Sequence, residues 1–242
     1  MFQVQNATMI QGEALTRLFD MPSECIDAIL TDPPYSTGGT YAGQRQQRTA
    51  LKYQSSRTKT RYLDFPGDNR DQRSFLAWAS LWLTQCYRVA RPGGVLMVFI
   101  DWRQLPVLSD ALQAGGWTWR HILVWDKPTA RPMLGDFKNQ CEFVLVGAKG
   151  KFSPWRRACL PGVFRCSIVA PTKRRHMTEK PVPLLEDLLQ IVPEGGTVLD
   201  PFAGSGATGA ACLRTGRTFI GMEMCPGYYE IACERLREEA VR

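Results

Sequence analysis

Short runs of apolar residues alternate with longer amphipathic segments along most of this chain, and this alternation limits the folds open to it. Several runs are apolar at nearly every position, which is typical of strands covered on both faces. We predict strands at Ala7–Ile10, Ile26–Thr31, Val95–Ile100, Ile122–Trp125, Phe143–Val146, Thr197–Leu199 and Thr218–Gly221. We predict helices at Gly12–Phe19, Arg73–Ala90, Gln104–Ala114, Val182–Ile191, Gly206–Arg214 and Gly227–Glu239. This order predicts an α/β fold with a mainly parallel, doubly wound sheet and helices on both faces.

The length of the chain and two irregular segments indicate one domain with insertions. A chain of 242 residues fits a single α/β domain. Residues 36–72 and 149–176 break the alternation, and a loop as long as the first is usually functional or disordered in a compact domain. We therefore predict one domain over residues 1–242, with basic insertions at 36–72 and 150–175.

Positive charge is concentrated in the same two segments. The net charge is +7, and residues 36–75 contribute +5 while residues 149–180 contribute +8, so the rest of the chain carries −6. Such segments on an acidic scaffold suit a partner rich in phosphates. Phe152, Trp155 and Phe164 are interleaved with the cations, as on nucleic-acid surfaces. Solvated basic loops and a small apolar patch are the competing interpretation, and charge alone does not separate DNA from RNA.

Several classes of protein are disfavoured by the composition. The sequence shows no early basic and apolar segment and no apolar run of about 18 residues, so we expect no secretory signal and no membrane span. Its eight cysteines form no C-x-x-C pair and it has only two histidines, so we expect free thiols and no metal site. A reducing, cytoplasmic environment fits this cysteine usage.

The first chemical motif is Asp32-Pro33-Pro34-Tyr35, which directly follows the strand predicted at Ile26–Thr31. Ligands of open α/β sheets bind outside the carboxyl ends of strands. Two prolines fix φ and remove two backbone donors, so the segment offers rigid acceptors beside an aromatic ring. Those groups suit a planar ring with an exocyclic amine, whose N–H groups need acceptors as positive charge develops on nitrogen. A simple turn that ends the strand is the competing interpretation.

The second motif follows the strand predicted at Thr197–Leu199. There Asp200-Pro201-Phe202 leads into a G-x-G turn that opens a helix, and glycines let the backbone approach a ligand closely. Glu223 comes at the end of the next strand, where an acid can accept both hydroxyls of a ribose, although it could also begin a surface loop. No Walker lysine follows the glycines, so a nucleoside ligand is favoured over a triphosphate.

Together these motifs resemble the β-group of amino-methylating DNA methyltransferases. In that group D-P-P-Y lies near the N-terminus and F-x-G-x-G near the C-terminus, as Asp32–Tyr35 and Phe202–Gly206 do here. His176–Pro181 also resembles the T-E-K-P segment of the family. The resemblance covers nearly the whole chain apart from the two basic segments.

This resemblance implies a Rossmann-like methyltransferase fold, S-adenosylmethionine as cofactor and double-stranded DNA as partner. It implies that Asp200 meets the methionine amino group, that Glu223 holds the ribose, and that Thr178 and Lys180 lie near the methionine carboxylate. Glu13 stands where the family usually has an Asp near the adenine. The catalytic residues would be Asp32, Pro33, Pro34 and Tyr35. The cofactor residues would be Glu13, Thr178, Lys180, Asp200, Phe202, Ala203, Gly204, Gly206 and Glu223.

The resemblance also bears on the target base, because Asp at the first motif position resembles adenine enzymes and Ser there resembles cytosine-N4 enzymes. We predict methyl transfer to adenine N6 by direct attack after base flipping. Cytosine-C5 methylation needs a thiolate from a Pro-Cys dipeptide, and this chain has only the reversed Cys225-Pro226. Cytosine-N4, RNA or protein-amide methylation and a non-catalytic DNA-binding protein on the same scaffold stay open as alternatives.

Candidate DNA contacts come from the two basic segments, where recognition of the target would also lie. They are Arg45, Arg48, Lys52, Arg57, Lys59, Arg61, Lys151, Arg156, Arg157, Lys173, Arg174 and Arg175. The second segment is short for a recognition region of this family, so the 36–72 loop shares the task or the site is short. A homodimer is compatible with the resemblance.

Overall fold

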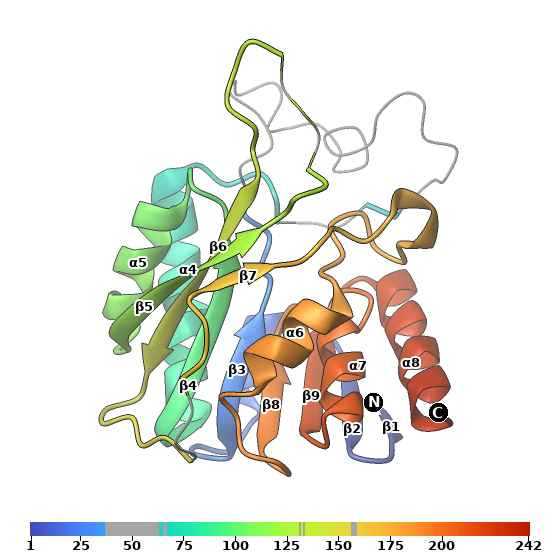
Figure 1. The fold of residues 1–242 in the computed structure, drawn as a ribbon. Coiled ribbons are helices and arrows are strands. Elements are labelled where there is room, and N and C mark those ends of the chain that lie inside the picture. Colours follow the sequence, from blue (N-terminus) through green and yellow to red (C-terminus); the bar gives the residue numbers. More distant parts are fainter. Residues whose placement is uncertain (37–62, 65–66, 131, 133, 156–158) are drawn as a thin grey trace.

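The computed structural model describes residues 1–36, 63–64, 67–130, 132, 134–155 and 159–242, and a nine-stranded sheet forms its centre (Figure 1). The order of the strands across the sheet is β1-β2-β9-β8-β3-β4-β6-β5-β7. Their bounds are β1 Phe2–Val4, β2 Ala7–Gln11, β3 Ile26–Thr31, β4 Ala90–Ile100, β5 Thr118–Asp126, β6 Cys141–Ala148, β7 Val163–Arg165, β8 Thr197–Asp200 and β9 Thr218–Glu223.

The middle of the sheet is parallel. Strands β2, β9, β8, β3 and β4 pair in parallel, so their carboxyl ends lie along one side of the sheet, which we call the carboxyl edge. Strand β6 runs antiparallel to β4, and Ile100 pairs with Phe143. The beginning of β6 therefore lies at the carboxyl edge, beside the end of β4. Strand β5 is antiparallel to β6, β7 is parallel to β5, and β1 is antiparallel to β2.

Helices cover both faces of the sheet, and two apolar clusters fill the spaces between the layers. Leu18, Phe75 and Leu108 belong to one cluster, and Leu184, Ala211 and Leu236 belong to the other. Helices α1 (Ala14–Phe19), α4 (Gln72–Val89) and α5 (Leu105–Ala114) pack on the first face, and α6 (Val182–Leu189), α7 (Ala207–Arg214) and α8 (Pro226–Ala240) pack on the second. The short 3-10 helix η1 (Pro171–Lys173) precedes α6.

The α/β fold with a mostly parallel sheet and helices on both faces is confirmed, and β3 has the predicted bounds. Strands β1 and β7 were not predicted, because three residues are too short to display an alternation. Strand β7 lies within the second basic segment, where Phe164 is buried and the indole N–H of Trp125 donates to the carbonyl of Cys166 at 2.8 Å. In the described part of the chain, no helix has the length and apolar character needed to cross a membrane.

Candidate active site

Strands β3 and β8 bring the two chemical motifs together. They are paired in parallel through Ala28 with Val198 and Ile29 with Leu199. At the carboxyl edge, the Thr31 hydroxyl donates to a carboxylate oxygen of Asp200 at 2.7 Å, and Asp32 is the next residue after Thr31. Asp32 and Asp200 both line one cavity of about 480 Å³. We call this the central cavity.

Asp32 is held by two donors at the wall of the central cavity. The Tyr35 hydroxyl donates to one carboxylate oxygen at 2.5 Å, and the Lys180 ammonium donates to the other at 2.6 Å. Pro33 is buried and Pro34 is half-buried, so the turn after β3 packs firmly against the protein. A carboxylate has about four lone-pair sites, so each oxygen of Asp32 can still accept one more hydrogen bond.

Lys180 also lies close to a second carboxylate, that of Glu142 at the beginning of β6. The Lys180 ammonium is 3.3 Å from Glu142, and Lys127 donates to the same residue at 2.7 Å. The Tyr35 hydroxyl is 3.4 Å from Glu142. Lys180 and Lys127 thus balance the charges of Asp32 and Glu142 within a site that is largely shielded from solvent.

The pKa values of this cluster follow from burial and from the opposite charges. Burial raises the pKa of Asp32, and Lys180 opposes that rise. Burial acts to raise the pKa of Glu142 too, but Lys180 and Lys127 outweigh it and hold the pKa below its usual value. For Lys180 burial acts to lower the pKa, yet Asp32 and Glu142 outweigh it and raise it above 10.5. Lys180 is therefore a fixed cation at neutral pH.

The turn after β8, residues 201–206, lies at the wall of the cavity next to Asp200. Gly204 and Gly206 have φ of +52° and +76°, a region that L residues with a side chain rarely adopt. A Cβ on Gly206 would lie 3.1 Å from the Cβ of Ala232 on α8, so a larger residue is also excluded by packing. Ala203 donates its N–H to the carbonyl of Met222 at 2.9 Å, which ties the turn to β9. The first residues of α7, Ala207 and Thr208, also line the cavity.

Asp200 is buried and accepts three hydrogen bonds from the protein. Besides Thr31, the hydroxyl of Thr208 donates to it at 2.7 Å and the N–H of Phe202 at 3.1 Å. Burial raises the pKa of Asp200 to about 6, and the hydrogen bonds from Thr31 and Thr208 oppose this rise. Phe202 packs edge-on against Trp82 and is tilted against Trp78, with ring centroids 5.2 and 5.5 Å apart.

Glu223 and Glu13 lie at the end of the cavity near β9 and α1. The carboxylate of Glu223 accepts the N–H of Gly204 at 2.9 Å and that of Cys225 at 2.7 Å. Burial raises the pKa of Glu223 to about 7. Glu13 caps α1, because its two oxygens accept the N–H groups of Leu15 and Thr16. All four acids of the sequence motifs, Glu13, Asp32, Asp200 and Glu223, therefore line the same cavity.

Residues His176–Lys180, which belong to the segment that resembles T-E-K-P, also line the cavity. Thr178 lines it, and its N–H lies 3.3 Å from a ring nitrogen of His176. Burial lowers the pKa of His176 to about 3, so its ring is neutral. Glu179 also lines the cavity and pairs with Arg235 on α8, with both side chains buried. The Lys180 ammonium lies between the carboxylates of Asp32 and Glu142, and its role near a methionine carboxylate stays a prediction.

Aromatic rings surround the Lys180 ammonium on the Asp32 side of the cavity. Its distance is 5.3 Å from the Tyr35 ring centroid, 5.2 Å from that of Phe99 and 5.9 Å from that of Trp125. These rings and the acceptors of Asp32 form a pocket with flat apolar walls and a polar floor. Such a pocket suits a heteroaromatic ring that carries an amine.

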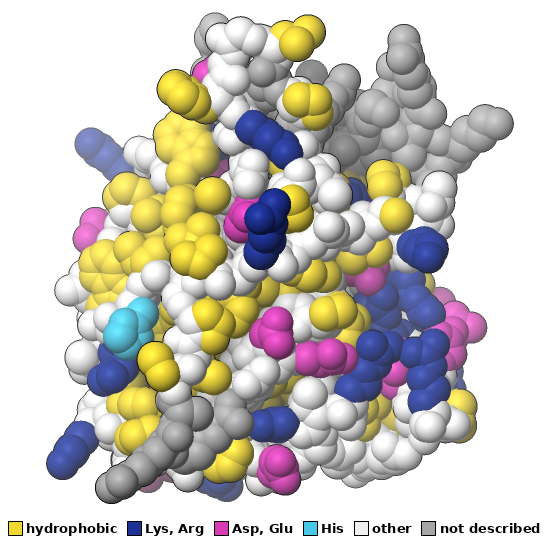
Figure 2. Space-filling view, in the orientation of Figure 1, with side chains coloured by type: hydrophobic (Ala, Val, Ile, Leu, Met, Phe, Trp, Pro, Cys, Tyr) yellow, Lys and Arg dark blue, Asp and Glu magenta, His cyan; other side chains and the backbone are white. Residues whose placement is uncertain are grey.

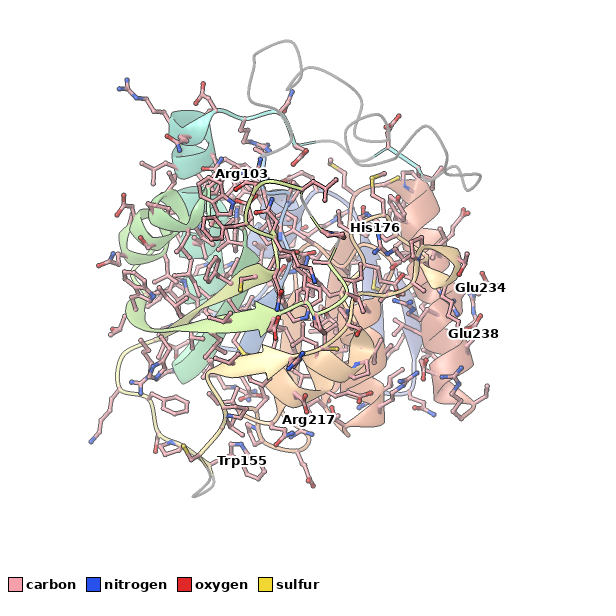
Figure 3. All side chains as sticks on the ribbon, turned by 45° about the horizontal axis from the view of Figure 1, so that its top comes forward. Arg103, Trp155, His176, Arg217, Glu234 and Glu238 are labelled. Atoms are coloured by element: carbon pink, nitrogen blue, oxygen red, sulfur yellow. The ribbon has the colours of Figure 1, made fainter. Side chains whose placement is uncertain are left out.

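Only some of the predicted DNA contacts lie on described residues. Lys151 and Lys173 are exposed, whereas Arg174 lines the cavity and donates to the carbonyl of Val169 at 2.7 Å. Arg175 pairs at 2.5 Å with Glu238, which is labelled on α8 in Figure 3. The remaining candidates, Arg45, Arg48, Lys52, Arg57, Lys59, Arg61, Arg156 and Arg157, lie outside the described residues. A role in DNA binding stays a prediction for all of them.

Sequence reasoning missed Glu142 and Lys127 altogether. A charged residue at position 142, directly before the apolar run Phe143–Val146, was a detectable signal, because strands covered on both faces rarely carry one. In the described parts of the chain, no group of three or more His, Cys, Asp or Glu side chains is arranged to hold a metal ion.

Comparisons with known proteins find a relative by sequence and solved structures with the same fold. YubD of Escherichia coli (strain K12), a presumed methylase, is 30% identical over 229 residues, which cover 94% of this chain and 88% of that protein. The solved M1.HpyAVI–SAM complex has a TM-score of 0.68 at 23% identity, and 95% of this chain and 98% of that chain are covered. The PvuII DNA methyltransferase, described as cytosine-N4-specific, has a TM-score of 0.73 at 17% identity, with coverage of 99% and 93%.

The family itself is shown by a match over most of the chain. The model of the N6/N4 methyltransferases, described as DNA methylase, matches residues 26–234. That range begins at the first residue of β3 and includes both motif turns, Glu142 and Lys180. The chain therefore belongs to the N6/N4 family of DNA methyltransferases.

Proposed function

We propose that this protein transfers a methyl group from S-adenosylmethionine to the N6 amino group of adenine in double-stranded DNA. The observation that carries the proposal is the convergence of Asp32 and Asp200 on one cavity, joined by the hydrogen bond from Thr31. An amine acceptor and a nucleoside site thereby lie side by side. Asp rather than Ser at position 32 favours adenine, by the same resemblance that is given in the sequence analysis.

The turn after β8 fits the nucleoside part of this cofactor. Gly204 adds no side chain to the wall of the cavity, and Glu223 lies beside it with carboxylate lone-pair capacity left for ribose hydroxyls. Asp200 and Thr178 would face the methionine end, Phe202 and Ala203 would line the loop, and Glu13 would lie near the adenine. When bound, S-adenosylmethionine supplies an electrophilic methyl group on a sulfonium ion.

The residues around Asp32 would prepare the target amine. Asp32 would accept a hydrogen bond from one amine N–H, and the rigid carbonyls of the Pro33-Pro34 turn would accept the other. These contacts stabilise the positive charge that develops on nitrogen as it attacks. Lys180 opposes the rise that burial causes in the pKa of Asp32, and so favours the ionised carboxylate, which is the stronger acceptor.

The target base must leave the duplex, because its amine is not reachable inside the stack. Tyr35, which lines the cavity and is only half-buried, would offer an aromatic face in exchange for the lost stacking, at about 1–3 kcal/mol for each stacked base. Holding the amine in line with the methyl group would supply much of the acceleration.

Cytosine-N4 methylation is the second candidate, and one observation favours it. The PvuII enzyme, which is described as cytosine-N4-specific, has the same fold at a TM-score of 0.73. Cytosine also carries an exocyclic amine, and Asp32 could accept a hydrogen bond from its N–H. The chemistry of transfer would be the same, and only the base in the pocket would differ.

A labelling experiment tests the proposal. Unmethylated duplex DNA is incubated with S-adenosylmethionine that carries a radioactive methyl group, in the presence of a chelator, and the product is digested to nucleosides. We expect the label in N6-methyladenine, no transfer by Asp32→Ala, and normal transfer by the surface control Asp20→Ala. Label in N4-methylcytosine would mean that the target base is cytosine and not adenine. DNA binding without any label would support the non-catalytic alternative.

A further inference from the structure

The hairpin that connects β5 and β6 joins the central cavity to the outside of the molecule. The residues of its base, Lys127, Asn139 and Cys141, line the cavity. Beyond them the loop projects past the carboxyl edge of the sheet, and it is the yellow-green segment that rises above the strands in Figure 1. Its tip therefore lies on the side from which a base would enter the pocket.

Two large apolar side chains stand in solvent at this tip. Leu134 is fully exposed and Phe137 is 93% exposed. Among the described residues, the other large apolar side chains with more than 80% exposure are Met1 and Val241, which lie at the chain ends. Figure 2 shows several hydrophobic side chains among polar ones at the top of the molecule. Exposed apolar groups gathered at one place indicate a surface that binds a partner.

Hydrogen bonds hold the two sides of the hairpin together, so that Leu134 and Phe137 are kept in solvent and do not fold back onto the protein. The N–H of Lys127 donates to the carbonyl of Gln140 at 2.9 Å, and the Lys138 ammonium donates to the carbonyl of Pro128 at 2.6 Å. The Gln140 amide also bonds to Asp126 at the end of β5. These contacts hold the two strands of the loop together below the tip.

We propose that Leu134 and Phe137 enter the DNA duplex as a wedge and fill the space that the extruded base leaves. This inference rests on the proposed function. Apolar side chains that insert between base steps unstack them and open the helix. The base of the hairpin lines the cavity that would receive the flipped base, its tip carries these apolar groups beyond that cavity, and Lys138 adds positive charge toward phosphates.

A DNA duplex is the favoured partner for this surface, because the partner must accept both apolar and cationic side chains. Trp102, in the turn after β4, also lines the cavity and is 60% exposed, and the next residue, Arg103, lines it too and is labelled in Figure 3. Aromatic and basic residues that alternate around a cavity mouth match stacked bases flanked by phosphates. The family to which the chain belongs acts on DNA.

The test compares two DNA substrates and two matched pairs of variants. Leu134→Ser and Phe137→Ser remove the tips, and Leu81→Ser and Phe19→Ser remove residues that are also exposed, at 55% and 62%, but lie on α4 and α1. Methyl transfer is measured as kcat/KM on a duplex that the wild type methylates and on the same strand without its complement. A wedge is needed only when a base has to be displaced from a stack.

We expect the combined Leu134→Ser and Phe137→Ser variant to lose about tenfold or more in kcat/KM on the duplex and less than about twofold on the single strand. The control variants should lose nothing on either substrate. Equal losses on both substrates, or no loss on the duplex, would overturn the wedge. If the wild type labels no DNA at all, the proposed function fails instead, a result that differs from any selective loss.

Discussion

Replacing Lys180 by Met would remove the cation that two buried carboxylates share. The Lys180 side chain is 7% exposed, and those of Asp32 and Glu142 are 23% and 19% exposed. Breaking a buried ion pair by removal of one partner costs about 3–5 kcal/mol, because the other charge is left uncompensated. For a domain of this size each kcal/mol lowers Tm by about 2–4 °C, so we expect Lys180→Met to lower Tm by roughly 6–20 °C near pH 8.

The dependence of that loss on pH follows from the same charges. In the wild type Lys180 acts to lower the pKa of both Asp32 and Glu142, so both values rise in the variant. When the pKa of a carboxyl group is higher in the folded than in the unfolded state, the folded protein loses stability as pH rises from the unfolded-state pKa to the folded-state pKa. The Tm difference from the wild type should therefore be largest near pH 8 and shrink toward about pH 5.

Calorimetry over this pH range measures the effect, with two controls. Lys149→Met removes a lysine that is 14% exposed and whose carboxylate partner, Glu24, is 55% exposed, and a pair that solvent screens on one side contributes only about 0–1 kcal/mol. Adding Asp32→Asn to Lys180→Met removes one of the uncompensated charges and should restore part of the lost Tm. A loss in Lys180→Met no greater than in Lys149→Met, or a loss that does not vary with pH, would refute the reasoning.

Further predictions concern the cofactor turn and the DNA surface. Glu223→Gln should weaken S-adenosylmethionine binding about tenfold or more by titration calorimetry, since hydrogen bonds to charged groups contribute about 1.5–3 kcal/mol; unchanged affinity would remove Glu223 from the site. Burial raises the pKa of Asp200 to about 6 and that of Glu223 to about 7, both above their usual values. The stability of the cofactor-free protein, measured by urea unfolding, should therefore fall as pH rises from about 4 to 7. Glu223→Gln should reduce the part of this fall that occurs near pH 7. Gly206→Ala should destabilise more than Gly195→Ala in the same assay, because both glycines have φ near +75° but only Gly206 has Ala232 at 3.1 Å from the added Cβ; equal losses would mean that packing against α8 is unimportant. DNA affinity should fall steeply with salt in a fluorescence titration, as expected when Lys and Arg neutralise several phosphates, and a flat response would contradict an electrostatic interface.

The parallel core and its motif turns could be predicted because each depends on local sequence. An apolar run ending in Asp32 and another ending in Asp200 determine strand, turn and chemistry within a few residues of each other. Parallel pairing then places both ends at one edge of the sheet, as the hydrogen bond from Thr31 to Asp200 illustrates. The glycines of the turn after β8 were recognisable for the same reason.

The Glu142 and Lys180 contacts could not be predicted, because they depend on how distant strands are oriented. The apolar run of β6 does not reveal that it is antiparallel to β4. Only that orientation brings the first residues of β6, rather than its last, to the carboxyl edge beside Asp32. Lys180 was assigned by resemblance alone, and its position between Asp32 and Glu142 is a tertiary property of three separate elements.

A crystal structure of the protein with S-adenosylmethionine tests the convergence of the two strand ends most directly. It should show the ribose at Glu223, the methionine end beside Asp200, and the sulfonium methyl group directed at the pocket formed by Asp32 and Tyr35. A cofactor bound outside the central cavity, or one whose methyl group points away from Asp32, would contradict the account.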